Sequence, residues 1–162
     1  MFERTERIAF DLDGRRVVAA VPTNRLLIDL LREEFGILGV RAGCDGGVCG
    51  ACTVLVDGAP ATACLLLAVE ADGRRVTTIR GLERADGSLH PVQRAFLEER
   101  ALQCGSCTPA MMLLASALLA EDPAPDDETI RSWMGAALCR CGGGAAILRA
   151  VRRSATLIRE GA

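Results

Sequence analysis

Short apolar runs separated by turn residues open the chain. Residues 8–12 and 17–21 are rich in aliphatic side chains, and Asp13-Gly14 stands between them. Runs of this length are typical of strands, and Asp-Gly favours the two-residue turn that joins neighbouring antiparallel strands. The pattern therefore predicts an opening β-hairpin.

The spacing of apolar residues then changes to that of a helix. Positions 22–24, which are proline, threonine and asparagine, supply helix-start signals, and Gly36 is a candidate C-cap. The predicted apolar face consists of Leu26, Leu27, Leu30 and Leu31. We expect one helix that packs this face against the strands.

A second hairpin is predicted after this helix. Residues Thr53 to Val56 alternate as a strand, and Asp57-Gly58 is a strong two-residue turn signal. A return strand would bring Cys64 back beside the start of the first strand. A further strand around 76–79 would complete a small mixed sheet, and residues 81–89 have the composition of a linker.

The second half of the chain has helical period only. Its apolar spacing predicts four helices, interrupted at Pro123-Ala124-Pro125 and at the glycine run 142–144. The predicted helical segments are 92–100, 109–120, 127–134 and 145–159. The chain is thus predicted to be α+β, with a sheet-containing domain at 1–80 and a four-helix bundle at 81–162.

Composition narrows the setting of the protein. The chain has 162 residues, 50% of them hydrophobic, and a formal net charge of −2, which argues against a nucleic-acid binder. Its longest mainly apolar run, 109–120, is too short to cross a bilayer, and the charged start 1–4 lacks the apolar core of a signal peptide. We expect a cytoplasmic chain with no membrane span. Four arginines near the end are predicted to form a solvated helix face: Arg149, Arg152, Arg153 and Arg159.

All the cysteines of the chain fall into two quartets, and the first has the spacing C-x4-C-x2-C with a distant fourth member. Its members are Cys44, Cys49, Cys52 and Cys64. This is the plant-type [2Fe–2S] spacing, whereas zinc sites usually pair two short knuckles. Glycines at 43, 46, 47 and 50 permit turns that point successive N–H groups towards the sulfurs of a cluster. The first quartet therefore predicts a [2Fe–2S] centre.

The second quartet is less decisive by its spacing alone. Its members are Cys104, Cys107, Cys139 and Cys141. A C-x2-C pair followed far away by C-x-C is also compatible with structural zinc. The first pair precedes Thr108-Pro109, which has the pattern of an N-cap followed by proline at the first helical position, and the second pair precedes a helical repeat. Two helix N-termini would converge there and suit a net negative cluster.

The compartment decides between metal centres and disulfides. In the reducing cytoplasm, an even number of cysteines favours metal ligands over a disulfide framework. A chain of this length also does not need disulfides in order to fold. We therefore expect eight thiolate ligands.

Three stretches resemble the motifs of the small iron–sulfur subunit of the molybdenum hydroxylases, the xanthine oxidase, aldehyde oxidoreductase and carbon monoxide dehydrogenase family. The stretches are Arg41-Ala-Gly-Cys44-Asp-Gly-Gly-Val-Cys49-Gly-Ala-Cys52, Gln103-Cys104-Gly-Ser-Cys107-Thr-Pro109 and Leu138-Cys139-Arg140-Cys141. The resemblance implies a plant-type ferredoxin-like β-grasp domain followed by a helical domain, each with one [2Fe–2S] cluster. It also implies partners, namely a large subunit with the molybdopterin cofactor and a medium subunit that often binds FAD.

The resemblance further implies a role for the chain. Electrons would pass from the molybdopterin centre to the second cluster, then to the first cluster and towards FAD or another acceptor. Gln103, Arg140 and Cys141 would approach the molybdopterin, although a structural salt bridge is an equally good expectation for Arg140. The chain would thus be the iron–sulfur subunit of an oxidoreductase that binds no substrate itself.

Several positions depart from the usual pattern of the family. Ser106 and Ala110 replace commoner residues in the Gln-Cys-Gly-x-Cys-Thr-Pro-Gly motif. Ala136-Ala137 stands where Gly-Asn is usual, and residues 142–144 are glycines where Thr-Gly-Tyr is usual. No ligand is lost, so we expect these changes to affect the surroundings and the potential of the second cluster.

The remaining candidates have structural interpretations. His90 is the single histidine and is expected at a helix start, because a Rieske centre needs two. Asp126 and its acidic neighbours are expected to cap a helix. No nucleophile, general base or phosphate loop is visible, so no catalytic residue is predicted. The alternative function is a stand-alone electron carrier or redox sensor of ferredoxin type, which would need an exposed charged docking face.

Overall fold

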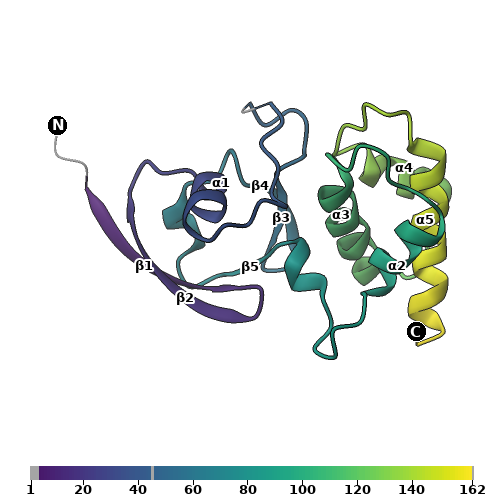
Figure 1. Cartoon of the computed structure of the whole chain (residues 1–162), viewed down its shortest axis with the longest axis horizontal. Coiled ribbons are helices and arrows are strands. Elements are labelled where there is room, and N and C mark those ends of the chain that lie inside the picture. Colours follow the sequence, from purple (N-terminus) through teal and green to yellow (C-terminus); the bar gives the residue numbers. More distant parts are fainter. Residues whose placement is uncertain (1–3, 45, 162) are drawn as a thin grey trace.

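The computed structural model describes residues 4–44 and 46–161. The sheet and the helical half lie side by side along the long axis of the molecule, with the N-terminus at the far end of the sheet (Figure 1). Each half has its own hydrophobic core. The two halves meet where β3 faces α3, so the cysteine loops at the ends of these elements lie close to the boundary.

Within the described residues, one sheet of five strands forms the first half, in the order β2-β1-β5-β3-β4. Strands β1 and β5 run parallel, and the other neighbouring pairs are antiparallel. The strands are β1 (Thr5–Leu12), β2 (Arg15–Pro22), β3 (Thr53–Val56), β4 (Ala59–Thr62) and β5 (Arg75–Thr77). Both predicted hairpins, β1-β2 and β3-β4, are confirmed.

Both hairpin turns have the conformation that Asp-Gly favours. Asp13 and Gly14 have φ of 52° and 80°, and Asp57 and Gly58 have φ of 53° and 90°. Positive φ at both central residues gives a turn whose twist matches that of the two strands. The Asp13 carboxylate also accepts hydrogen bonds from the backbone N–H and the hydroxyl of Thr78, at 2.6 and 2.7 Å.

This contact with Asp13 shortens the last strand. The predicted strand at 76–79 was wrong at its end, because β5 stops at Thr77 and residues Ile79–Leu82 form a 3-10 turn. The N–H of Thr78 bonds the Asp13 carboxylate instead of a neighbouring strand. The Thr78 hydroxyl then caps the turn by accepting the N–H of Arg80 at 3.3 Å.

The helix of the first half begins later than its start signals suggested. Helix α1 (Leu27–Asp29) continues into a π-helical turn at Leu30–Glu34, whose C-cap is Phe35. The predicted C-cap Gly36 follows Phe35 directly and ends the helix in the left-handed conformation, with φ of 63°. Residues 23–25 instead complete a turn after β2, in which the Thr23 N–H bonds the carbonyl of Arg4 at 2.9 Å. Three of the four predicted leucines are buried in the core under the sheet: Leu27, Leu30 and Leu31.

Four helices build the second half within the part of the chain that the structure describes. They are α2 (Pro91–Glu98), α3 (Thr108–Glu121), α4 (Asp127–Met134) and α5 (Gly144–Arg159), close to the predicted segments. Helix α3 is hydrophobic almost all round, as expected of a helix covered on several sides. It packs against β3 on one side and against the other helices on the other.

The predicted helix caps are largely confirmed. His90 caps α2 by accepting the Val92 N–H on its Nδ1 at 3.2 Å, and Asp126 caps α4 by accepting the Thr129 N–H at 2.8 Å. The assignment of Thr108 as an N-cap was wrong by one residue, because Cys107 occupies that position and Thr108 is already helical. The candidate ligand Cys107 is therefore fixed directly at a helix start.

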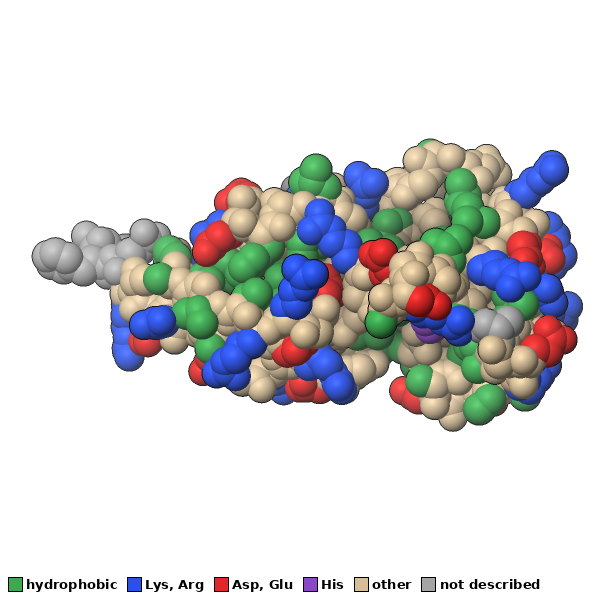
Figure 2. Space-filling view, turned by 60° about the horizontal axis from the view of Figure 1, so that its bottom comes forward, with side chains coloured by type: hydrophobic (Ala, Val, Ile, Leu, Met, Phe, Trp, Pro, Cys, Tyr) green, Lys and Arg blue, Asp and Glu red, His purple; other side chains and the backbone are tan. Residues whose placement is uncertain are grey.

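The arginines of α5 are solvent-exposed, as predicted, but they also connect helices. Arg149 pairs with Glu99 at 3.0 Å, Arg153 pairs with Glu98 at 2.9 Å, and Arg152 pairs with Asp127. Exposed pairs of this kind contribute little stability each. On the face shown in Figure 2, positive and negative side chains are interspersed over the helical half. In the described part of the chain, none of the helices combines the length and the hydropathy that a membrane span requires.

Candidate metal centres

The first cysteine quartet is assembled by a loop and a hairpin. Cys44 and Cys49 lie in the loop before β3, Cys52 immediately precedes β3, and Cys64 follows β4. The hairpin pairs Thr53 with Thr62, and the Ala63 N–H bonds the carbonyl of Cys52 at 3.3 Å. The return strand thus places Cys64 beside Cys52, as the sequence predicted.

The four thiols of this quartet form two close pairs. The side chains of Cys44 and Cys49 interact as one hydrogen-bonded pair, and those of Cys52 and Cys64 form the other. Cys44 is exposed, whereas Cys52 and Cys64 are buried. The quartet therefore has a solvent-facing pair and an interior pair.

Backbone amides converge on the solvent-facing pair. The Cys49 N–H lies 3.3 Å from the Cys44 sulfur, and N–H groups of Gly46, Cys49 and Val48 together lower the pKa of the Cys44 thiol to about 7. By contrast, burial raises the pKa of Cys52 to about 11. A Cβ on Gly43 would lie only 2.8 Å from the Cys49 sulfur, so this glycine leaves room for the ligand. The loop is built to stabilise negative charge on sulfur.

The second quartet surrounds a small hollow between the loop before α3 and the loop before α5. All four of its cysteines line this hollow, together with Gln103. The thiols again form two pairs, Cys104 with Cys141 and Cys107 with Cys139. This arrangement confirms that residues from two distant segments meet at one site.

Both segments end in helix starts, as predicted. Cys107 is the N-cap of α3 and Gly143 is the N-cap of α5. The backbone N–H of Gly143 is the main cause of a lowered pKa of the Cys139 thiol, and the N–H of Ser106 is the main cause of a lowered pKa of Cys104. Burial raises the pKa of Cys107 to about 11. Backbone N–H groups of the segments that lead into both helices thus face the sulfurs here too.

Four thiols gather at each site, and their pairing bears on the kind of centre that they fit. A structural zinc needs four ligands around one point. Across residues 4–44 and 46–161, no three histidine, cysteine, aspartate or glutamate side chains form a group that could hold one metal ion. The hydrogen-bonded thiol pairs at each site, with charge interactions between the pairs, fit a centre with two irons, in which each iron takes two thiolates. The donor set therefore fits a [2Fe–2S] cluster at each quartet.

The three residues predicted to approach the molybdopterin differ in their exposure to solvent. Gln103 is exposed beside the second quartet, and Cys141 is half-buried. Arg140 is exposed, and no carboxylate in the described ranges pairs with it. Exposed apolar side chains flank the site at Leu102 and Leu138.

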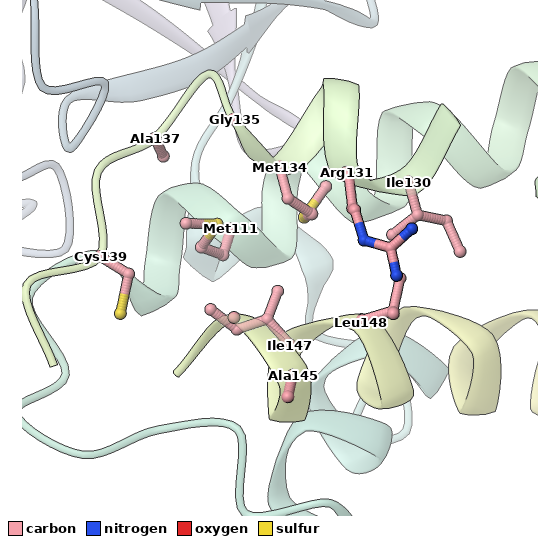
Figure 3. A pocket seen from close by; sticks show the side chains of 11 residues that line it. Met111, Ile130, Arg131, Met134, Gly135, Ala137, Cys139, Ala145, Ile147 and Leu148 are labelled. Atoms are coloured by element: carbon pink, nitrogen blue, oxygen red, sulfur yellow. The ribbon is translucent and has the colours of Figure 1, made fainter. Parts of the chain in front are cut away.

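A pocket that sequence reasoning missed adjoins the second quartet. It has a volume of about 440 Å³ and lies between α3, α4 and α5, with Met111, Met134 and Ile147 pointing into it and Cys139 at one end (Figure 3). Ala137 and Gly144 also line it. Both are smaller than the asparagine and tyrosine usual at these positions. The glycine run at 142–144 is therefore the sequence feature that could have predicted this pocket.

Alanine at Gly144 and alanine at Gly142 are expected to change stability in opposite directions. A Cβ at Gly144 meets open space, and the φ of Gly144 is not positive. Gly144→Ala should therefore stabilise the fold by about 0.5 kcal/mol, because alanine lowers the conformational entropy of the unfolded chain. Gly142 has φ of 74°, so Gly142→Ala should destabilise the fold by about 1 kcal/mol. Thermal unfolding of the cluster-loaded variants measures both changes in stability. Equal shifts of the same sign in melting temperature would contradict the different backbone conformations of Gly142 and Gly144.

Comparison with protein families assigns both halves of the chain. Residues 10–77 match the 2Fe-2S iron-sulfur cluster binding domain, and residues 78–152 match the [2Fe-2S] binding domain. The nicotinate dehydrogenase small FeS subunit of Eubacterium barkeri is 46% identical over 90% of this chain and 92% of its own length. The nicotine 6-hydroxylase small subunit of Paenarthrobacter nicotinovorans is 42% identical over 91% of this chain and 89% of its own length.

Solved structures agree with these relatives. A chain of quinoline 2-oxidoreductase from Pseudomonas putida 86 superposes with a TM-score of 0.91 at 41% identity, covering 97% of this chain and 98% of that one. The aldehyde oxidoreductase from Desulfovibrio desulfuricans matches with a TM-score of 0.90 at 37% identity, over 96% of this chain but 17% of that chain. Two thiol quartets on this fold, with relatives of this kind over nearly the whole length, establish that the chain belongs to the small iron–sulfur subunits of the molybdenum hydroxylases, which carry two [2Fe–2S] clusters and transfer electrons.

Proposed function

We propose that Cys44, Cys49, Cys52 and Cys64 hold the first cluster and that the second quartet holds the other, made up of Cys104, Cys107, Cys139 and Cys141. The observation that carries this assignment is the folding of each quartet into two thiol pairs with backbone N–H groups aimed at sulfur. The clusters supply one-electron redox chemistry when bound. The protein fixes their position and favours their negative charge.

The finer architecture follows from the same assignment. We propose a plant-type ferredoxin-like β-grasp domain at 1–80 and a four-helix [2Fe–2S]-binding domain at 81–162. The separate hydrophobic cores of the two halves support this division. We also propose a cytoplasmic location, where the reducing environment keeps all eight thiols available as ligands.

The clusters differ in what surrounds them, which supports a direction of electron flow. Gln103 and the half-buried Cys141 lie at the second site, where the exposed Leu102 adds apolar surface for a partner. We propose that the molybdopterin held by a large partner chain approaches here, with Arg140 beside it. At the first site the exposed Cys44 and the 84% exposed Val48 leave the cluster loop open to a partner that binds FAD or to another acceptor.

The partners are proposed from the names of the relatives and from the extent of the matches. One relative is the aldehyde oxidoreductase iron-sulfur-binding subunit PaoA of Escherichia coli, and this chain corresponds to only 17% of the Desulfovibrio desulfuricans enzyme. The remaining functions would therefore lie in other chains. We propose that substrate oxidation takes place on the large molybdopterin subunit.

Native co-purification followed by low-temperature EPR tests this function. At low salt the tagged chain should retain a large molybdenum-containing partner, and the dithionite-reduced complex should show two distinct S = 1/2 signals with about four irons per small chain. A chain purified alone with both signals would favour the stand-alone carrier. Zinc in place of iron, without EPR signals, would refute both electron-transfer functions.

A further inference from the structure

The two cysteine loops are in direct backbone contact. The N–H of Leu138 donates a hydrogen bond to the carbonyl oxygen of Cys49 at 2.8 Å. Cys49 belongs to the first quartet, and Leu138 is the neighbour of Cys139 in the second. A short path made of covalent bonds and one hydrogen bond therefore connects a ligand of one site with a ligand of the other.

Gly50 makes this contact possible. Its φ is 66°, and a Cβ built on it would lie 2.0 Å from the carbonyl oxygen of Ala136 and 2.9 Å from the Cα of Ala137. Both clashing atoms belong to the backbone, so a change of side-chain rotamer could not relieve the overlap. Any side chain at position 50 would have to push the two loops apart.

Neither loop is free to retreat. On one side, the Gly50 carbonyl accepts hydrogen bonds from the hydroxyl and the N–H of the buried Thr53, at 2.7 and 3.1 Å. On the other side, the N–H groups of Ala136 and Ala137 bond the carbonyls of Trp133 and Met134 at 3.1 and 3.2 Å. Ala137 is also buried in the helical core. The contact is therefore held by rigid elements of both halves.

We propose that Gly50 is a positioning residue for electron transfer, and that the hydrogen bond from Leu138 to Cys49 is the bridge that couples the two clusters. The proposal rests on the proposed function, because it takes the quartets as ligands of two clusters. In the coupled step one electron leaves the reduced second cluster and enters the oxidised first cluster, with no bond broken and no proton moved. Tunnelling falls steeply with separation and is weaker across a gap than along bonds, so opening the contact should uncouple the clusters.

Gly50→Ala in the whole complex tests the role of the glycine, with Gly58→Ala as its matched control. Both glycines have positive φ, but a Cβ at Gly58 meets nothing within 4 Å, so the two variants share the conformational strain and differ in the clash. The readout is the rate at which the first cluster reoxidises the reduced second cluster, followed by freeze-quench EPR of the two signals. We expect Gly50→Ala to slow this transfer while keeping both signals and the iron content, and Gly58→Ala to keep the rate, the signals and the iron content.

A second pair of variants tests the hydrogen bond itself. Leu138→Pro removes the donor N–H, whereas Leu138→Ala keeps it and shortens a side chain that is 52% exposed. We expect Leu138→Pro to slow reoxidation of the second cluster by the first while keeping both EPR signals, and Leu138→Ala to keep the rate and the signals. This pair decides the question if Gly50→Ala fails to assemble its first cluster.

The outcomes separate the inference from the function on which it rests. Two signals with an unchanged transfer rate in Gly50→Ala and Leu138→Pro would overturn the inference and leave the two-cluster function intact. Two signals with no electron transfer between the clusters in the unaltered complex would also overturn the inference. Absence of two iron–sulfur signals in the unaltered complex would instead refute the function.

Discussion

Replacing Cys52 by alanine is expected to empty the first cluster site and leave the second one filled. Cys52 is buried at the start of β3 and pairs with Cys64, so its loss removes a thiolate where no other donor can enter. The second quartet has its ligands on other elements of the chain. Iron should fall from about four to about two per chain, with loss of one EPR signal.

Cys107→Ala is the matched control, because Cys107 is a partly buried candidate ligand of the second quartet. It should give the converse result, in which the other EPR signal disappears and the first remains. Circular dichroism of both variants separates loss of a cluster from loss of the fold. Retention of both signals in either variant would contradict the assignment of that cysteine as a ligand.

In the cluster-free chain, Cys44 is expected to react with iodoacetamide about a hundredfold faster than Cys52 at pH 7. With a pKa of about 7, half of the Cys44 thiol is thiolate at that pH, whereas Cys52, with a pKa of about 11, is thiolate to roughly one part in ten thousand. The lower intrinsic nucleophilicity of a low-pKa thiolate cancels part of this advantage, which leaves about a hundredfold. Burial of Cys52 acts in the same direction.

The dependence on pH follows from the same values. Labelling of Cys44 should rise as the pH increases through 7 and then level off, whereas labelling of Cys52 and Cys107 should still be rising near pH 11. Mass spectrometry of peptides after short labelling pulses measures each site. The urea-unfolded chain is the control, because its cysteines should react alike. Equal rates in the folded chain would contradict the amide-lined loop around Cys44.

Local signals explain which parts of the fold the sequence predicted correctly. Asp13-Gly14 and Asp57-Gly58 determine their turns through φ preferences of two adjacent residues, and Asp126 determines the start of α4 through its own side chain. Such features depend on residues within one turn of each other. They survive in any tertiary context that leaves the segment exposed.

The errors arose where distant residues compete for backbone groups. Strand β5 ends early because Asp13, from the first hairpin, takes the N–H of Thr78. The helix of the first half starts at Leu27 because residues 23–25 are held in a turn whose N–H bonds Arg4. The sequence next to each boundary contains no sign of these distant hydrogen-bond partners, Asp13 and Arg4. Local helix and strand signals therefore misplaced the end of β5 and the start of α1.

For the site, the sequence spacing predicted two cysteine quartets, and the structure brings the members of each quartet together. The pairing within each quartet and the exposure of each thiol depend on where the hairpin and the two helix starts lie in space, so these needed the structure. The pocket beside Cys139 likewise needed it, because Gly144 and Ala137 enclose a space only once α3, α4 and α5 are packed together. No single segment contains the walls of that pocket.

The sequence by itself determined the two cluster motifs, the order of a sheet-containing half and a helical half, and the family, because these are carried by residue types at short, fixed spacings. Only the tertiary structure decided how the two halves meet. The close approach of Gly50 to Ala136 and the bond from Leu138 to Cys49 join residues far apart along the chain. Contacts of that kind have no local signature, because they depend on the packing of β3 against α3 rather than on the preferences of either loop.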